Sequence, residues 1–297
     1  MVYKISIIGA GGRMGSWFAR HVSGIPNTEL SLYDIEPFFY SITNARLYDD
    51  IEKCVSDSDM VIVCTPLDKT PSIVLECSKN MKDDACLIEI SSIKSKSFPT
   101  LQSIPSSIHP VCIHPMFGPG ADNISNVKIL LVPVRNQQKE LELTNTLFKN
   151  TNIIIISSYQ EHDNLMAIIL GITYFSNIIF GHIVSQNNLI DLKRISGTTF
   201  GIQSTLCEGI FSDSLELIVS LLVENPSLKF FVENYIAESH KIAKMMFDNE
   251  FSALETELHK IKNSLLFSSN LRNSYNKMYA MYDILNAKNN NDDKCDK

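Results

Sequence analysis

Residues 2–15 constrain the fold more than any other stretch, because an apolar strand pattern runs directly into a cluster of glycines. Val2 to Ile8 alternates and then becomes fully apolar, as a buried parallel strand does, and helical spacing starts at Trp17. The glycines between them let the backbone approach a bound group. The helix N-terminus behind the turn offers unpaired N–H groups and a partial positive charge. The pattern therefore predicts a strand, a turn and a helix that bind a phosphate group.

The spacing of these glycines is that of a dinucleotide-binding turn with one substitution. Counted from Gly9, the third glycine of G-x-G-x-x-G falls one residue late; counted from Ala10, Gly12 and Gly15 fit. A second apolar strand at 29–33 ends in Asp34, where such folds place the acid that accepts from the adenosine ribose hydroxyls. We predict dinucleotide binding by Gly9, Ala10, Gly11, Gly12, Arg13, Met14, Gly15 and Asp34. The Asp34 carboxylate would repel a 2′-phosphate, which favours NAD, while Arg13 keeps NADP as the alternative.

Strand and helix patterns alternate up to about Val134 and then give way to long helical periodicity. Further strands are predicted at 59–64, 85–90 and 128–134, and polar or turn residues follow the strand ends, namely Thr65, Pro66, Ser91, Ser92 and His114. Open α/β sheets bind ligands at the carboxyl ends of their strands, so these residues are expected to meet at one crevice, with Thr65 and Pro66 against the cofactor.

This change of periodicity predicts two domains. After a last strand at 152–158, helical spacing continues to about Asn286. We expect an α/β Rossmann-type N-terminal domain at 1–158, an all-α substrate-binding and dimerisation domain at 159–286, and a disordered polar tail at 287–297.

Composition excludes several partners. The net charge of −7 and the lack of a basic cluster argue against nucleic acid. No set of His, Cys and Asp has metal-ligand spacing, so no metal is predicted. The chain starts directly in a strand pattern without a signal sequence, and its odd number of scattered cysteines is typical of reduced packing residues in a cytoplasmic protein: Cys54, Cys64, Cys77, Cys86, Cys112, Cys207 and Cys295.

The segment 165–184 is apolar and long enough to cross a bilayer. It contains Asn177 and His182 and lacks flanking basic residues, so we predict no membrane span and a helix buried on all sides at a domain or subunit interface. Together with the apolar segment 215–223, it exceeds what one small helical domain can bury. A homodimer built through the helical domain is therefore expected.

His114 is the candidate for proton transfer. It stands a few residues beyond an apolar strand pattern, in a predicted loop whose course is fixed by the prolines and glycines of the run 113–120. His162 is expected to form a capping or interdomain hydrogen bond rather than to take a direct chemical role, which stays the alternative, and His109 lies outside this run.

Four motifs resemble those of the prephenate dehydrogenase family of tyrosine biosynthesis. They are Gly11-Gly12-Arg13-Met14-Gly15, Ser92-Ile93-Lys94, His114-Pro115-Met116-Phe117-Gly118-Pro119 and Glu161-His162-Asp163; Asn225-Pro226 resembles a helix start of the family. The resemblance implies an NAD-dependent oxidative decarboxylation of prephenate to 4-hydroxyphenylpyruvate. It implies that His114 deprotonates the ring hydroxyl with a pKa near the ordinary value of about 6.5. It also implies that Ser92 hydrogen-bonds to His114 or to that hydroxyl.

The departures from the family fall on the substrate side. The family usually has an arginine where this chain has Ser220, and often an acid where it has Gly120. A dicarboxylate needs cationic partners, for which Lys193 and Arg194 are candidates and Arg272 a weaker one.

Three functions therefore stay open. The chain is a prephenate dehydrogenase, an arogenate dehydrogenase, or a catalytically silent nucleotide-binding relative. A general β-hydroxyacid dehydrogenase is disfavoured, because no lysine follows Glu161-His162-Asp163 until Lys193.

Overall fold

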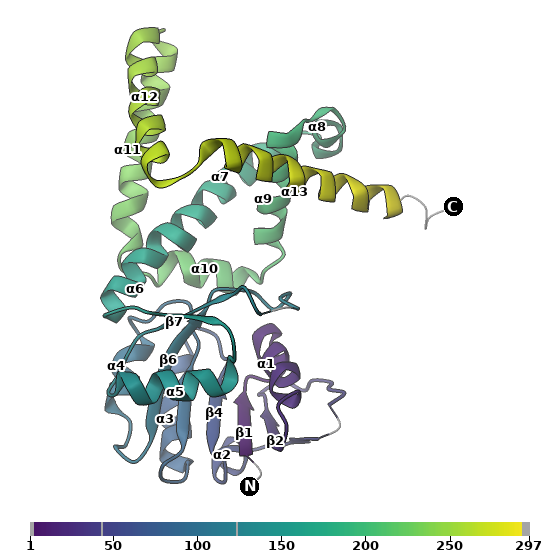
Figure 1. Ribbon diagram of the computed structural model, residues 1–297, viewed down its shortest axis with the longest axis vertical. Coiled ribbons are helices and arrows are strands. Elements are labelled where there is room, and N and C mark those ends of the chain that lie inside the picture. Colours follow the sequence, from purple (N-terminus) through teal and green to yellow (C-terminus); the bar gives the residue numbers. More distant parts are fainter. Residues whose placement is uncertain (1–2, 43, 123, 293–297) are drawn as a thin grey trace. The chain divides into compact units, whose positions relative to one another are not determined.

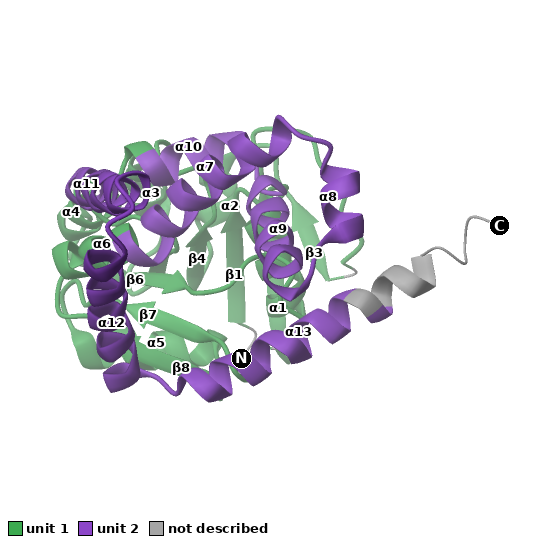
Figure 2. Cartoon of the chain, turned by 90° about the horizontal axis from the view of Figure 1, so that it is seen from above, with its two compact units in different colours: residues 1–167, 223–227 green, residues 168–222, 228–297 purple. Residues whose placement is uncertain are grey.

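The computed structural model describes residues 3–42, 44–122 and 124–292 (Figure 1). The chain divides into two compact units, coloured separately in Figure 2. The first comprises Met1–Ala167 and Val223–Ser227, and the second comprises Ile168–Leu222 and Leu228–Lys297. The first unit thus keeps α6 (Tyr159–Met166) and a short segment far along the chain, both beyond the expected boundary at residue 158.

An eight-stranded sheet forms the centre of the first unit, in the order β3-β2-β1-β4-β5-β6-β7-β8. Neighbouring strands are parallel except for the antiparallel pair β6 and β7. The strands are β1 (Tyr3–Ile8), β2 (Thr28–Tyr33), β3 (Ala45–Leu47), β4 (Met60–Val63), β5 (Cys86–Glu89), β6 (His109–Pro115), β7 (Lys128–Leu131) and β8 (Asn152–Ile155). This order confirms the α/β Rossmann-type fold, whose strand order reverses between β1 and β4.

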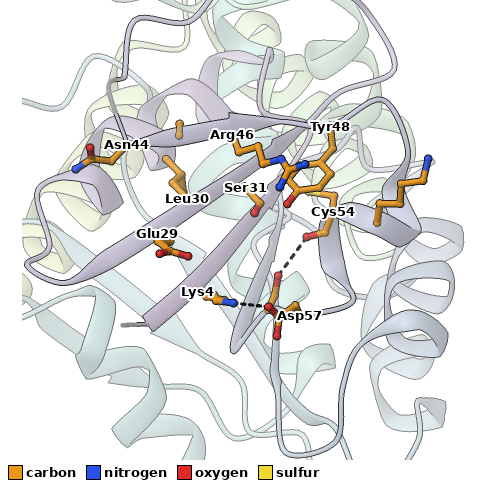
Figure 3. A pocket seen from close by; sticks show the side chains of 12 residues that line it. Lys4, Glu29, Leu30, Ser31, Asn44, Arg46, Tyr48, Cys54 and Asp57 are labelled. Atoms are coloured by element: carbon orange, nitrogen blue, oxygen red, sulfur yellow. Dashed lines mark hydrogen bonds and ion pairs between the residues drawn. The ribbon is translucent and has the colours of Figure 1, made fainter. Parts of the chain in front are cut away.

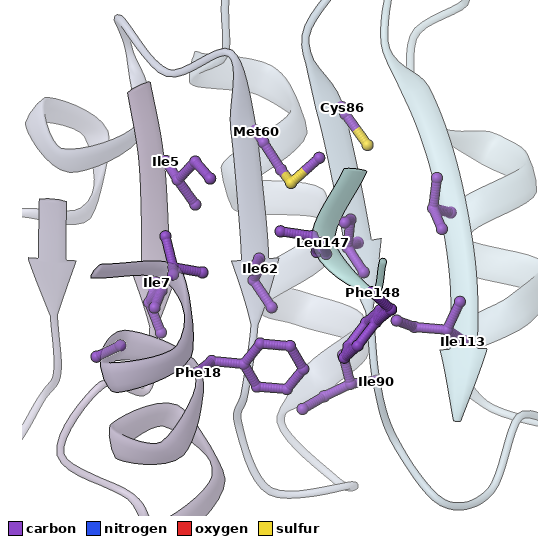
Figure 4. Close-up of a cluster of buried hydrophobic side chains, with 14 of the residues drawn as sticks. Ile5, Ile7, Phe18, Met60, Ile62, Cys86, Ile90, Ile113, Leu147 and Phe148 are labelled. Atoms are coloured by element: carbon purple, nitrogen blue, oxygen red, sulfur yellow. The ribbon is translucent and has the colours of Figure 1, made fainter. Parts of the chain in front are cut away.

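Helices cover both faces of this sheet and seal two apolar clusters. In one cluster the rings of Phe18 and Phe148 meet edge to face, with centroids 5.9 Å apart, over Ile7 and Ile62 (Figure 4). The other cluster packs Val74 and its neighbours against the opposite face. Because both faces are covered, the central strands are apolar throughout, as all four residues of β4 are. The helices are α1 (Arg13–Ser23), α2 (Ile51–Val55), α3 (Thr70–Asn80), α4 (Ser97–Ser103), α5 (Gln137–Leu147) and α6.

All regular elements in the described residues of the second unit are helices, which fits the expected all-α region. Its elements are α7 (Thr173–Ser185), α8 (Leu189–Ile195), α9 (Thr198–Phe211), α10 (Leu215–Val223), α11 (Leu228–Phe247), α12 (Phe251–Ser268) and α13 (Leu271–Asp292), and a π-helix at Ala167–Ile172 joins α6 to α7. Buried Asn177 ties α7 to α9, because its side-chain oxygen accepts from Gln203 at 2.8 Å and its carbonyl accepts from Cys207.

Two expectations need correction here. The segment 165–184 is helical, but it is not buried on all sides in the single chain, since Ile168, Ile169, Ile179 and Ile183 are exposed. Within the described residues, Tyr159–Ser185 is the one helix long and apolar enough to cross a membrane, by length and composition only. The expected tail at 287–297 is helical as far as Asp292, because each added residue of α13 gains a backbone hydrogen bond, and residues 293–297 lie outside the described part.

The six described cysteines are free, and all but Cys64 are buried. Cys295 lies outside the described residues.

Candidate active site

The glycine turn leads from β1 into α1 with almost no room for side chains. Gly9 has a φ of +83°, and a Cβ there would lie 2.5 Å from the Cys64 carbonyl oxygen. A Cβ on Gly15 would lie 1.9 Å from the Gly9 carbonyl oxygen. Gly12 precedes α1 and supplies no side-chain cap, so the N-terminal end of the helix is open to an anion. These features fit a bound pyrophosphate.

A hollow of about 390 Å³ adjoins this turn. Its lining comprises Gly11, Gly12, Arg13, Ser16, Arg20, Pro119 and Gly120. Arg20 donates to Ser16 Oγ at 2.9 Å and adds a second cation beside Arg13. Arg20 was missed in the sequence, although its place one helical turn after Ser16 puts it on the face of α1 that follows the glycines. A Cβ on Gly120 would meet no atom within 4 Å, so steric crowding does not account for glycine there.

Asp34 lies directly beside the glycine turn. Its Oδ2 accepts from the Gly11 amide at 2.8 Å and its Oδ1 from the Glu36 amide at 3.2 Å. Thr65 follows β4 on the other side of the turn, since its methyl carbon would lie 3.3 Å from a Cβ on Gly9. The Pro66 carbonyl accepts from Thr70 at 3.0 Å and fixes the start of α3. The structure thus brings Asp34, Thr65 and the glycines to one edge of the sheet.

His114 lies in a strand rather than in the expected loop. It is the sixth residue of β6, and β7 pairs with the segment Ile113–Pro115 in antiparallel register, which extends the strand beyond its apolar part. The imidazole is only 5% exposed. The antiparallel pairing was not visible in the sequence, because it joins segments separated by the run of prolines and glycines.

His114 belongs to a triad of buried polar side chains, with His162 and Asp163 at the start of α6. His114 Nδ1 lies 3.0 Å from His162 Nε2, and His162 Nδ1 lies 2.8 Å from Asp163 Oδ1. An ionised carboxylate only accepts hydrogen bonds, so His162 carries its proton on Nδ1 and accepts at Nε2. His114 must then donate from Nδ1, which leaves the lone pair on its Nε2. The triad therefore assigns a tautomer in which His114 Nε2 is a base.

His114 Nε2 is not fully buried. Thr28 Oγ1 is the single described side-chain N or O atom that is fully buried without a partner. His114 Nε2 has no partner among the described residues either, so it keeps solvent access. Burial lowers the pKa of His114 well below 6.5, and His162 and Lys94 lower it further. The expected pKa near 6.5 is therefore wrong, because burial penalises the charged imidazolium.

The helix cap expected at His162 is not observed. Ser158 is the N-cap of α6, while the His162 side chain is fully buried between His114 and Asp163. Burial lowers the pKa of His162, and the hydrogen bond with Asp163 opposes that shift. The adjacent pair of His and Asp after a strand was a signal in the sequence for a partner to His114, but nothing there placed the pair next to β6.

Ser92 is half-buried in the segment that follows β5, and its hydroxyl makes no hydrogen bond to any described residue. The expected bond between Ser92 and His114 is absent from this part of the chain. Its neighbour Ser91 instead donates to Glu89. The Ser92 hydroxyl is free to bind a ligand.

Lys193 and Arg194, the candidate substrate cations, lie in α8 of the second unit. Lys193 pairs with Glu208 at 2.5 Å and Arg194 with Asp191 at 3.4 Å, and all four side chains are exposed. Ser220 lies in α10 of the same unit, and Arg272 at the start of α13. These contacts are those of surface ion pairs.

A further hollow of about 380 Å³ lies near the start of β1 and along β2 and β3 (Figure 3). Lys4 and Asp57 form an ion pair at its wall, and none of the predicted site residues lines it. Among the described residues, no group of three His, Cys, Asp or Glu side chains could hold a metal ion.

Comparison with known proteins gives one family. The model of the prephenate dehydrogenase nucleotide-binding domain matches residues 23–157. A probable arogenate/prephenate dehydrogenase of Methanocaldococcus jannaschii is 24% identical over 82% of this chain and 56% of its own length. The T-protein of Haemophilus influenzae is 25% identical over 84% of this chain and 63% of its own. The chain thus spans about 60% of the length of these curated relatives.

Solved structures of the family share the fold. The A. aeolicus prephenate dehydrogenase in complex with hydroxyphenyl propionate and NAD+ superposes with a TM-score of 0.70 at 18% identity, covering 91% of this chain and 99% of that one. For Synechocystis arogenate dehydrogenase the TM-score is 0.66 at 13% identity, with 90% and 100% covered.

Proposed function

Because the chain belongs to the prephenate dehydrogenase family, we propose that it oxidises and decarboxylates prephenate with NAD, giving 4-hydroxyphenylpyruvate, NADH and carbon dioxide. The observation that carries this proposal is the triad, which leaves the lone pair of His114 on Nε2, an atom without a partner among the described residues. We propose residues 1–158 as the dinucleotide-binding part and 159–286 as the part that binds substrate and dimerises.

The proton steps follow from this geometry. His114 Nε2 takes the proton of the ring hydroxyl as the carbon beneath it loses hydride, and it returns a proton to that oxygen when carbon dioxide leaves and the ring becomes aromatic. Ser92 donates a hydrogen bond to the same oxygen. Asp163 stabilises positive charge that spreads from His114 to His162, as a buried carboxylate does behind a catalytic histidine.

Bound NAD would supply the hydride acceptor. The open end of α1 and the cations Arg13 and Arg20 are suited to its pyrophosphate, and the Asp34 carboxylate to ribose hydroxyls. Thr65 and Pro66 would border the nicotinamide half, because they follow β4 at the point where the strand order reverses. A 2′-phosphate near Asp34 would be repelled, which supports NAD over NADP.

Arogenate is the second candidate substrate. Its amino group replaces the keto group of prephenate, so it presents less net negative charge, and the serine at position 220 removes a cation that the family usually offers. The relatives include both prephenate and arogenate dehydrogenases. In either case Lys193 and Arg194 are the proposed carboxylate partners, and a cytoplasmic homodimer is the proposed working form.

NADH formation by the full chain tests the proposal directly. Prephenate and arogenate are each supplied with NAD and with NADP, and His114→Asn and His109→Asn serve as matched variants on β6. We expect turnover with NAD that His114→Asn removes and His109→Asn keeps. Absence of turnover with every pair of substrates would overturn the proposal and favour a silent nucleotide-binding protein.

A further inference from the structure

The buried ion pair between Glu89 and Lys94 has no explanation in the proton steps described above. Both side chains are completely buried, and Lys94 Nζ lies 2.8 Å from Glu89 Oε2. Removing two charges from water costs several kcal/mol for each ion, so such a pair contributes little to stability. A buried pair of this kind is better explained by what it holds in place.

Lys94 joins three segments that are distant in the sequence. Its Nζ donates to the carbonyl oxygen of Ile113 at 2.6 Å, directly before His114. Its backbone N–H donates to Asp163 Oδ1 at 2.8 Å, and the next amide, of Ser95, donates to Oδ2 at 2.8 Å. Lys94 also lies in the segment 90–96 that carries Ser92. One residue therefore binds Asp163 directly and the backbone next to His114, and it lies two residues after Ser92.

We propose that Lys94, held by Glu89, is the positioning residue of this site: it fixes His114 and Asp163 relative to each other and keeps a positive charge behind the two imidazoles. The kinetic part of this inference rests on the proposed function, whereas the structural part does not. The geometry satisfies every charged group involved, because Glu89 also accepts from Ser91 and lies 3.5 Å from Cys112 Sγ.

The titratable groups around the imidazoles come from three elements. Asp163 belongs to α6, Glu89 and Lys94 belong to β5 and the segment after it, and Cys112 belongs to β6. Burial lowers the pKa of Lys94, but the carboxylates of Glu89 and Asp163 oppose that shift, and the pKa of Lys94 is raised overall, so the ammonium stays charged. Burial raises the pKa of Cys112 well above its usual value, which leaves a neutral thiol.

Two substitutions separate an electrostatic role from loosened packing. Lys94→Met removes a charge that lowers the pKa of both histidines, so their pKa values should rise. Glu89→Gln keeps the shape of the side chain and removes a charge that raises the pKa of His162, so this value should fall or stay. Lys94 stays protonated over the whole pH range in which the imidazoles titrate, so its charge acts on them throughout the titration. Loosened packing would instead move both histidines toward their ordinary pKa, and hence upward, in both variants.

The experiment is an NMR titration of histidine-labelled full chain, with Lys79→Met as the control because Lys79 is an exposed lysine of α3. We expect the pKa values of both histidines to rise in Lys94→Met and that of His162 to fall or stay in Glu89→Gln. Neither pKa should change in Lys79→Met. An upward shift in both variants, or in neither, would overturn the inference. The titration needs no substrate, so it decides the matter even if the proposed function fails.

A double variant covers the case in which Lys94→Met alone does not fold. Lys94→Met with Glu89→Leu removes both charges at once, and apolar replacement of a buried pair often leaves stability unchanged. We expect this variant to fold but to lose about 100-fold in kcat, since small displacements of a base cost that much, with the KM for NAD unchanged. A folded double variant with wild-type kcat would contradict the positioning role.

Discussion

His114 owes its predicted reactivity to two partners that lie 48 and 49 residues further along the chain. Asp163 accepts from His162 Nδ1 and so fixes the tautomer of His162. His162 Nε2 then accepts from His114 Nδ1, which leaves the lone pair of His114 on Nε2. A base in this position typically contributes about 10²–10⁴-fold to the rate. His114→Asn should therefore lose that factor in kcat while NAD binding persists, as measured by NADH formation and by titration calorimetry. His109→Asn, on the same strand, should keep wild-type kcat.

Asp163→Asn tests the tautomer rather than the base itself. With its nitrogen in the place of Oδ1, the amide would donate to His162 Nδ1 and could no longer accept from the Lys94 amide, so that His162 Nε2 would carry the proton and donate to His114. The proton of His114 would then sit on Nε2, where a base is needed. We expect kcat to fall on the order of 10²–10⁴-fold, and the labelled imidazoles to show the exchanged tautomer in NMR spectra. Unchanged tautomers would refute this assignment.

The pH dependence follows from the lowered pKa values of both histidines. The basic form of His114 persists below pH 6.5, so the acid limb of kcat should lie below that pH. The unfolded chain binds protons near the ordinary pKa, whereas the folded chain does so only at lower pH. Folded stability should therefore be fully present above about pH 6.5 and decrease as the pH falls below it. Chemical denaturation at several pH values measures this, and His114→Asn should flatten the decrease.

Among the secondary elements, the turn from β1 to α1 depends most strictly on residue type. A Cβ on Gly15 would overlap the Gly9 carbonyl oxygen, which is backbone and cannot move without opening the turn. Gly15→Ala should lower the free energy of unfolding by roughly 1–3 kcal/mol and abolish NAD binding. Gly209→Ala is the matched control, since no atom lies within 4 Å of a Cβ there. Inside α9 this change should stabilise by about 1 kcal/mol.

Strands covered on both faces were predicted correctly, whereas a strand that depends on antiparallel pairing was not. The apolar periods at β1, β4 and β5 predicted these strands correctly, because a parallel strand covered on both faces must be apolar. The strand character of His114 was missed, since it depends on β7, whose pairing is antiparallel and not periodic in the sequence.

At the scale of the whole molecule, many exposed side chains of the second unit are apolar. They lie on several helices and include Ile179, Ile183, Leu215, Val219, Phe230 and Phe247. A surface this apolar is typical of an interface. We expect sedimentation at micromolar concentration to give a dimer, and Ile183→Glu with Val219→Glu to weaken it. Ile35→Glu, an exposed isoleucine of the first unit, should leave the mass unchanged, and a monomeric wild type would contradict the expectation.

Local sequence was enough for the α/β fold class, for the glycine turn and for the choice of His114, Ser92 and Asp34 as candidates. The fold class, the turn and Asp34 follow from periodicity and from steric limits that act within a few residues, whereas the roles expected of His114 and Ser92 follow from the motifs that resemble those of the family. The bonds of His114 to His162 and of Lys94 to Asp163, together with the depressed pKa of both imidazoles, depend on burial and on contacts across dozens of residues. Only the folded chain brings these groups together, because hydrogen-bond partners and local dielectric are properties of the packed interior rather than of neighbouring residues.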